Sequence, residues 1–156
     1  MHSGAAPDAA GAASGTGFFI CPDAALGLSA APRACIASHE AAQSHLLALL
    51  VKRAGAVPDP VTTREALLAG LRTNPYPDVL FLDTDLPGID GFHALESIRT
   101  KPSLESLRIV LVAATGKRAD LARALQLGAT GYIAKPLTRD IMEAALPQIF
   151  GKRKTA

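Results

Sequence analysis

The sequence has no tryptophan, and aromatic residues make up only 4% of its 156 residues, so Ala, Leu and Val must form its core. It has only two cysteines, Cys21 and Cys35, which we expect to be reduced thiols, with Cys35 as a small buried side chain. No apolar run approaches the roughly 20 residues needed to cross a bilayer. No Lys or Arg precedes the apolar patch near the N-terminus, which argues against a signal peptide. We therefore expect a soluble, cytoplasmic protein.

An excess of charge of one sign is also missing. The chain has 16 Lys and Arg residues against 14 Asp and Glu residues, a formal net charge of +2. This balance does not predict a surface that binds nucleic acid. The sequence shows no internal repeat, and no Gly-rich phosphate-binding loop follows its first expected strand. The length is that of a single domain with an ordinary hydrophobic core.

The N-terminal residues 1–32 are rich in Ala, Gly, Ser and Pro and almost uncharged, which predicts a largely disordered extension. One apolar patch, Phe18-Phe19-Ile20, interrupts it. We favour an incidental patch on the domain surface. The alternative is a docking segment that adds to a sheet edge or fills a groove in a partner. A folded domain is expected over 33–150, followed by a short basic tail at 151–156.

Short apolar segments alternate with helical patterns throughout the folded part. The expected strands are 34–37, 57–62, 79–82, 109–112 and 132–134. The expected helices are 40–54, 64–72, one from 91 on, 120–127 and 138–150, with Ser38 or His39 capping the first and Thr138 the last. This alternation predicts an α/β protein with a doubly wound parallel sheet.

The third expected strand is the most informative. It is apolar throughout, ends in the carboxylate of Asp83 and breaks into a loop with Pro87, Gly88 and Gly91. In an open parallel sheet, ligands gather just beyond the carboxyl ends of the strands. Asp83 is therefore the first candidate for a functional residue.

This stretch resembles the phosphoacceptor segment of response-regulator receiver domains, the modules that histidine kinases phosphorylate on aspartate. That segment is an apolar strand, an Asp, two variable residues and then Met-or-Leu-Pro-Gly-x-Asp-Gly. The matching residues here are Leu86, Pro87, Gly88, Asp90 and Gly91. The resemblance extends over about 33–150. It implies a flavodoxin-like (βα)5 fold with a five-stranded parallel sheet in the order 2-1-3-4-5, and a role in two-component (phosphorelay) signalling without enzymatic activity. In this order the second strand is an edge, which suits the loss of two ladder donors at Pro58 and Pro60.

The resemblance also assigns site positions. In such receivers two acids after strand one and the acceptor Asp hold Mg²⁺, while a Thr or Ser after strand four and a Lys after strand five bind the phosphoryl oxygens. The acceptor falls on Asp83 and the lysine on Lys135. The aromatic residue that swings inward on phosphorylation falls on Tyr132. The backbone carbonyl of Asp85 lies where the family offers a further Mg²⁺ ligand.

The sequence departs from this pattern at the acidic pair and at the hydroxyl. The acidic pair falls on Ser38 and His39, and the hydroxyl position falls on Ala113. Thr115 could replace the hydroxyl only after a register slip that would turn the faces of the strand over. Glu40 is the nearest spare acid, but this position points away from the site in the family.

These losses change the expected chemistry. One aspartate and one lysine balance each other, so we expect an Asp83–Lys135 ion pair. We expect only weak Mg²⁺ binding, through Asp83 and the Asp85 backbone, and no other cofactor. His39 could bind a transition metal with Asp83 or sense pH, but His45 and His93 lie on other helices. A polar loop residue at a helix start is the favoured interpretation of His39.

We therefore favour a pseudo-receiver that acts by protein–protein interaction. Its partners would be signalling proteins, either a histidine kinase or a downstream effector, with no nucleic acid or membrane. A homodimer could form through the face of the fourth helix, fifth strand and fifth helix, where Leu121, Arg123, Gln126 and Tyr132 fall. The main alternative is a working receiver phosphorylated on Asp83. A flavodoxin-like enzyme or cofactor carrier is the least favoured hypothesis.

Overall fold

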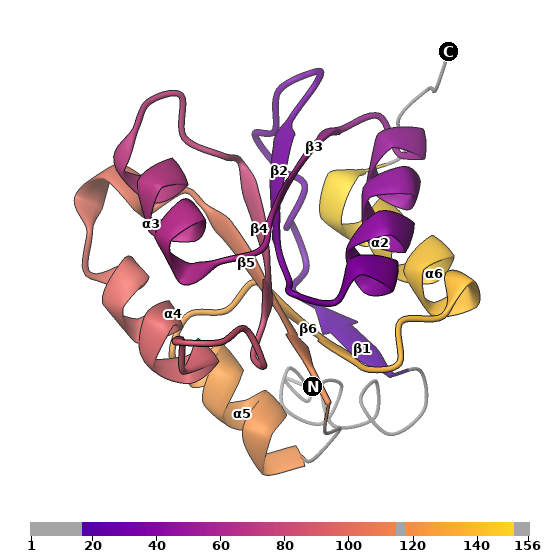
Figure 1. Cartoon of the computed structure of the whole chain (residues 1–156). Coiled ribbons are helices and arrows are strands. Elements are labelled where there is room, and N and C mark those ends of the chain that lie inside the picture. The colour runs from indigo at the N-terminus through magenta and orange to yellow at the C-terminus, as the bar shows by residue number, and fades with distance from the viewer. Residues whose placement is uncertain (1–16, 115–117, 152–156) are drawn as a thin grey trace.

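The computed structural model describes residues 17–114 and 118–151 and centres on a six-stranded sheet (Figure 1). Its strands are β1 (Phe18–Ile20), β2 (Arg33–Ala37), β3 (Val57–Val61), β4 (Val79–Asp83), β5 (Arg108–Ala113) and β6 (Gly131–Ala134). The strand order is β1-β6-β5-β4-β2-β3, and β2 to β6 are all parallel. The predicted fold class and the predicted order of the five parallel strands are confirmed.

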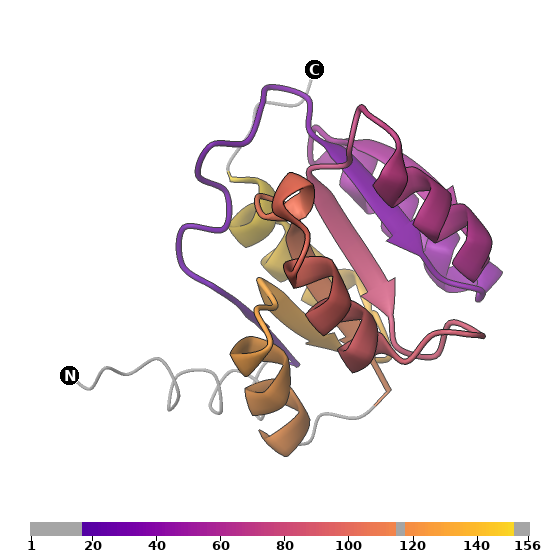
Figure 2. The same cartoon turned by 90° about the vertical axis from the view of Figure 1, so that its left-hand side faces the viewer.

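Two layers of helices cover the sheet. The helices are α2 (Ala41–Arg53), α3 (Arg64–Arg72), α4 (Gly91–Arg99), α5 (Arg118–Gln126) and α6 (Arg139–Phe150), with a 3-10 turn η1 (Pro102–Leu104) after α4. Helices α2 and α6 pack on one face, and α3, α4 and α5 on the other (Figures 1 and 2). All five residues of β4 are buried, because this central strand has helices on both faces. Among the described residues, no helix is long and apolar enough to cross a membrane.

Helix capping agrees with the sequence at one end of the chain only. The Thr138 hydroxyl accepts a hydrogen bond from the N–H of Ile141 (3.2 Å) and caps α6, as predicted. The expected cap of the first helix is wrong, because the N-cap of α2 is Glu40, without a side-chain bond. Ser38 still accepts a hydrogen bond from the N–H of Glu40 (3.1 Å), but its side chain is buried at the end of β2.

The proline-containing strand β3 is an edge, as predicted. Its odd-numbered positions face β2: Val57 N–H donates to the Pro32 carbonyl (2.8 Å), and Ser38 N–H donates to Val61 O (3.1 Å). Successive residues of a strand point their backbone groups to opposite sides, so the nitrogens of Pro58 and Pro60 face away from the sheet. The expected loss of two ladder donors therefore does not occur on the bonded side.

Strand β1 is the largest difference from the expected sheet. It pairs antiparallel with β6, with Phe18 opposite Ile133 and Ile20 opposite Gly131. Phe18 and Ile20 are buried in the core on the α2 and α6 face, while Phe19 packs partly on the other face. The Phe18-Phe19-Ile20 segment is thus not an incidental surface patch. It extends the sheet of its own chain.

The residues after β1 also pack on the domain. Ala24 is buried, and Arg108 donates from Nε to the Ala24 carbonyl (3.0 Å) and from Nη2 to the Leu26 carbonyl. The predicted disorder therefore does not hold for 17–32, because apolar burial and these hydrogen bonds hold this segment. Residues 1–16 and most of the basic tail lie outside the described residues. Both Cys21 and Cys35 are free thiols, in agreement with the sequence.

Candidate functional site

The candidate site lies at the carboxyl ends of the parallel strands. Asp83 is the last residue of β4, Ser38 directly follows β2, and Lys135 directly follows β6. Strands β2 and β4 are neighbours, and the parallel arrangement brings all these ends to one edge of the sheet. The structure therefore brings together three of the residues that the sequence analysis singled out.

Asp83 is the centre of this group. Its side chain is only 1% exposed. Its Oδ1 accepts hydrogen bonds from the N–H of Asp85 (2.8 Å) and from Lys135 Nζ (2.9 Å). Its Oδ2 accepts from Gln43 Nε2 (2.8 Å) and from the Ser38 hydroxyl (3.3 Å). A carboxylate offers about four lone-pair sites, so protein donors occupy the whole acceptor capacity of Asp83.

Lys135 contacts two further acids besides Asp83. Its Nζ lies 2.8 Å from Glu40 Oε1 and 3.2 Å from Asp85 Oδ2. The expectation that Glu40 points away is therefore wrong, and the Asp85 side chain turns inward to the cluster. The predicted Asp83–Lys135 pair is present, but the predicted charge balance is not. Three carboxylates around one ammonium group leave a formal charge of −2.

The pKa values of the two central groups follow from these contacts. Burial by itself would raise the pKa of Asp83, but the Asp85 N–H, the Lys135 ammonium and the Gln43 amide outweigh it and lower that pKa below its ordinary value. Burial would likewise lower the pKa of Lys135. Its contacts with Glu40, Asp83 and Asp85 prevail and raise it. The Asp83 carboxylate and the Lys135 ammonium are therefore both charged over a wide pH range.

Gln43 was missed by the sequence analysis. It lies in the first turn of α2, and its amide also donates to the Ser38 hydroxyl (3.0 Å). With Leu46, Leu47 and Leu50 it forms the i, i+3, i+4, i+7 stripe of the helix face that packs on the sheet. A polar residue on an otherwise apolar stripe was the available signal.

The remaining predicted positions do not supply polar side chains to the cluster. His39 is exposed, in contrast to its buried neighbour Ser38. Ala113 is buried, and its carbonyl accepts a hydrogen bond from the N–H of Lys135 (2.7 Å). Tyr132 is buried in the core, and this burial, with a smaller contribution from Asp120, raises its pKa to about 12. Thr115 lies outside the described residues.

The donor set does not fit Mg²⁺ as it is arranged. Magnesium requires near-octahedral oxygen ligands, mainly carboxylates and water. Here the Lys135 ammonium occupies the space between the carboxylates, and hydrogen-bond donors occupy both oxygens of Asp83. Over 17–114 and 118–151, no group of three or more His, Cys, Asp and Glu side chains is arranged to hold a metal ion.

The model of the response regulator receiver domain family matches residues 34–147, well over half of the chain. The chain belongs to this family. Receiver domains are modules of two-component signalling, which confirms the broad function that the sequence predicted.

Curated relatives support this family membership. A probable chemotaxis protein CheY from Rhizobium etli is 39% identical over 72 residues, 46% of this chain and 56% of that protein. A protein-glutamate methylesterase/protein-glutamine glutaminase from Nitrosomonas europaea is 39% identical over 106 residues, 65% of this chain and 27% of that protein. The chain thus spans only part of the length of these relatives.

Solved structures agree on the fold. A putative response regulator from Chloroflexus aurantiacus superposes with a TM-score of 0.68 at 26% identity, over 77% of this chain and 98% of that one. The chemotaxis response regulator CheY4 of Vibrio cholerae superposes with a TM-score of 0.67 at 18% identity, over 76% of this chain and 98% of that one.

Proposed function

We propose that this receiver domain is a pseudo-receiver, which acts in two-component signalling by binding other proteins rather than by accepting a phosphoryl group. One observation carries the proposal: protein donors use both oxygens of Asp83 fully. To attack phosphorus, a carboxylate oxygen must have a free lone pair. At Asp83 this would require breaking at least one of the four bonds to its oxygens, which come from Ser38, Gln43, Lys135 and the Asp85 N–H.

Two further features support a site that does not switch. Ala113 provides no hydroxyl for a phosphoryl oxygen, and such transfers depend on stabilisation of charge on these oxygens. Tyr132 is buried in the core. In receivers that switch, the aromatic residue at this position moves inward on phosphorylation. We propose that Tyr132 keeps its buried position and makes no such movement.

The proposed partners are a histidine kinase or a downstream effector. A homodimer through α5, β6 and α6 is a specific form of this binding. Two residues expected on that face belong to the core, since Leu121 and Tyr132 are both 1% exposed. Arg123 and Gln126 are exposed and remain available, with the Arg123 guanidinium over the Phe92 ring at 4.6 Å. Because β1 covers the edge of β6, partners would contact the helices rather than extend the sheet.

The test is an NMR titration of the ¹⁵N-labelled chain, first with Mg²⁺ and then with beryllofluoride, which mimics an aspartyl phosphate. We expect no site-specific shifts at millimolar Mg²⁺. Shifts at Asp83, Ala113 and Tyr132 that are lost in Asp83→Ala would refute the pseudo-receiver. We propose no enzymatic activity, since the methylesterase name belongs to a protein of which this chain covers 27%.

A working receiver is the second candidate, and the negative charge of the cluster favours it. Glu40 and Asp85 place two more carboxylates near Asp83. An excess of negative charge is the condition that a divalent cation relieves in this kind of site. If this candidate is correct, a small phosphoryl donor with Mg²⁺ will label the wild-type chain and not Asp83→Asn.

A further inference from the structure

We propose that the groove between α3 and α4 binds an acidic, amphipathic segment of a partner protein. The groove lies on the helical face opposite α2 and α6, and none of the residues that line it belongs to the Asp83 cluster. This inference rests on the proposed function, since it gives a protein-binding module a binding surface.

The groove is an apolar cavity of about 280 Å³ between two helical stripes. Helix α3 contributes Leu67, Leu68 and Leu71, and α4 contributes Ala94 and Ile98. Leu67, Leu71 and Ile98 form the buried floor, while Leu68 and Ala94 are half-buried at the opening. An apolar helix face or side chain that enters here would cover surface that is now partly exposed to water.

The charged residues around this cavity are all basic. Arg64, Arg72 and Lys101 line it, and no Asp or Glu does. All three are exposed, and none forms an ion pair with another described residue. A Cβ added at Gly88 would lie 3.3 Å from Arg64 Cδ, so the aliphatic stem of Arg64 packs over the Leu86–Ile89 loop. Arg64 is the first residue of α3, Arg72 is its last, and Lys101 follows the end of α4, so cations flank both ends of the groove.

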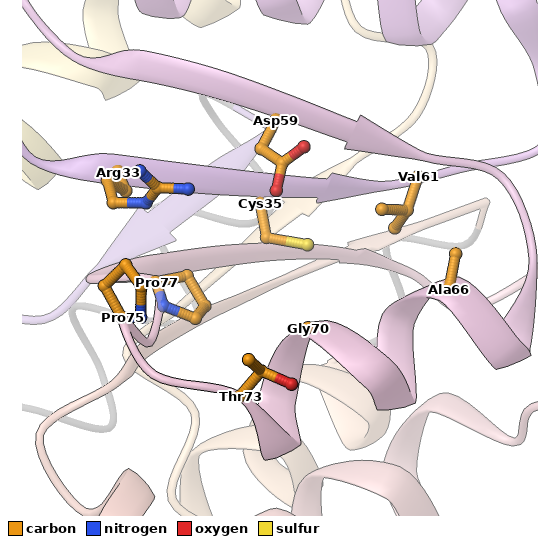
Figure 3. A pocket seen from close by; sticks show the side chains of 9 residues that line it. All are labelled: Arg33, Cys35, Asp59, Val61, Ala66, Gly70, Thr73, Pro75 and Pro77. Atoms are coloured by element: carbon orange, nitrogen blue, oxygen red, sulfur yellow. The ribbon is translucent and has the colours of Figure 1, made fainter.

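Two other cavities among the described residues do not share this charge pattern. The cavity of about 230 Å³ in Figure 3 is lined by both Arg33 and Asp59. Its Cys35 has a pKa raised to about 12 by burial and then by Asp59, so the thiol stays protonated. A third cavity of about 400 Å³ has Asp23 and Glu105 beside its arginines. The groove between α3 and α4 differs from these two because it has an apolar floor and the charged residues that line it are all cations.

These features define the chemistry of the occupant. A nine-residue helix such as α3 is about 13 Å long, which accommodates roughly two turns of a partner helix. Leucine-like side chains would fill the apolar floor, and carboxylates on either side would meet the three cations. The terminal segments of this chain do not match, because residues 1–16 contain a single acid, Asp8, and 152–156 contain none.

The test uses the full chain and two matched peptides of about 14 residues, ~20 Å when helical. Both carry Leu at i, i+3, i+4 and i+7; one carries Glu at the other positions and one carries Lys. We expect the Glu peptide to produce saturable NMR shifts at Leu68, Ala94 and Ser97, and the Lys peptide to bind about tenfold more weakly or not at all. Arg72→Glu and Lys101→Glu should each weaken the binding of the Glu peptide by a similar factor. Lys52→Glu, the same charge change on α2, should not.

Several results would overturn the proposal. These are equal binding of both peptides, no shifts on α3 and α4 at millimolar peptide, or an equal effect of Lys52→Glu. If laurate causes the same shifts and the Glu peptide does not, the groove binds a small amphiphile instead. Sedimentation showing a dimer that Lys101→Glu dissociates would assign it to a second copy of the chain.

The outcome is independent of the titration with Mg²⁺ and beryllofluoride. That experiment is read at Asp83, Ala113 and Tyr132, and the peptide experiment at Leu68, Ala94 and Ser97. Shifts in the first set would refute the pseudo-receiver and leave the groove intact. Silence in the second set alone would refute the groove and leave the pseudo-receiver.

Discussion

At the scale of single residues, the notable feature of Asp83 is that neutral groups contact one of its oxygens. The Ser38 hydroxyl and the Gln43 amide both donate to Oδ2, and the cation Lys135 contacts only Oδ1. Hydrogen bonds to a charged group stabilise a folded protein by about 1.5–3 kcal/mol each. These bonds therefore stabilise the fold around Asp83.

The first residue-scale prediction concerns Lys135. Lys135→Met should lower the free energy of unfolding by about 3 kcal/mol, because it leaves the buried Asp83 beside two acids without a cation. Glu40→Gln should cost less than about 1 kcal/mol, since Glu40 is half exposed and screened by water. Urea denaturation of the two variants measures both values. Similar losses in the two variants would contradict the buried Asp83–Lys135 pair as the centre of the cluster.

The second residue-scale prediction concerns the two acids of the receiver pattern that Ser38 and His39 replace. The double variant Ser38→Asp, His39→Asp restores two carboxylates next to Asp83, so it should bind Mg²⁺ about tenfold or more tightly than the wild type. Ser38→Ala removes the same hydroxyl without adding charge and should leave Mg²⁺ binding unchanged. Isothermal titration calorimetry with Mg²⁺ measures the difference. Tight binding by the wild-type chain would instead support the working receiver.

The residues of this cluster were only partly predictable. Asp83 and Lys135 were predictable because Asp83 ends a strand, Lys135 directly follows one, and the resemblance implied the order of these strands. Gln43, Glu40 and the Asp85 side chain were not. They reach the site through flexible side chains, and their direction depends on the space left when two short residues, Ser38 and Ala113, occupy positions usually held by larger polar groups. Spacing along a chain does not contain that information.

At the scale of elements, β1 depends on a glycine in the strand that it joins. A Cβ at Gly131 would lie 2.6 Å from Ile20 Cδ1 and 2.9 Å from the Phe19 carbonyl oxygen, so only glycine leaves room for β1 at this distance. The five parallel strands were predictable from their apolar runs. Strand β1 was not, because three apolar residues in an Ala- and Gly-rich segment have no measurable periodicity and pair with a strand at the other end of the sequence.

A pair of glycine variants tests this contact. Gly131→Ala should reduce stability by about 1–3 kcal/mol, because the methyl group must displace β1. Gly70→Ala should raise it by about 0.5–1 kcal/mol, since a Cβ at this helix position meets nothing within 4 Å and alanine favours helix. Thermal unfolding of both variants gives the two signs. A Gly131→Ala variant as stable as the wild type would show that β1 does not depend on the close approach at Gly131.

At the scale of the whole molecule, the cluster makes stability depend on pH. The pKa of Asp83 in the folded chain lies below its ordinary value of 3.8, so its contribution is complete above about pH 4 and is lost as the pH falls through the folded value. Lys135 acts at the other end of the pH range. Because its pKa is raised in the folded chain, its contribution to stability is complete below pH 10.5 and is lost as the pH rises above that value. Asp83→Asn should therefore flatten the acid limb of the unfolding free energy against pH. A limb as steep as that of the wild type would assign acid unfolding to other carboxylates.

The two borders of the sheet also have a consequence for the molecule in concentrated solution. An open strand edge is a template for pairing with another chain, and proteins avoid aggregation by using prolines, charges or very short strands there. One border here is β3, whose outward positions hold Pro58 and Pro60, and the other is β1, only three residues long. Replacing both prolines with threonine would leave the bonds to β2 in place and supply two outward N–H donors. The fold would persist, and the resistance to fibril formation would be lost.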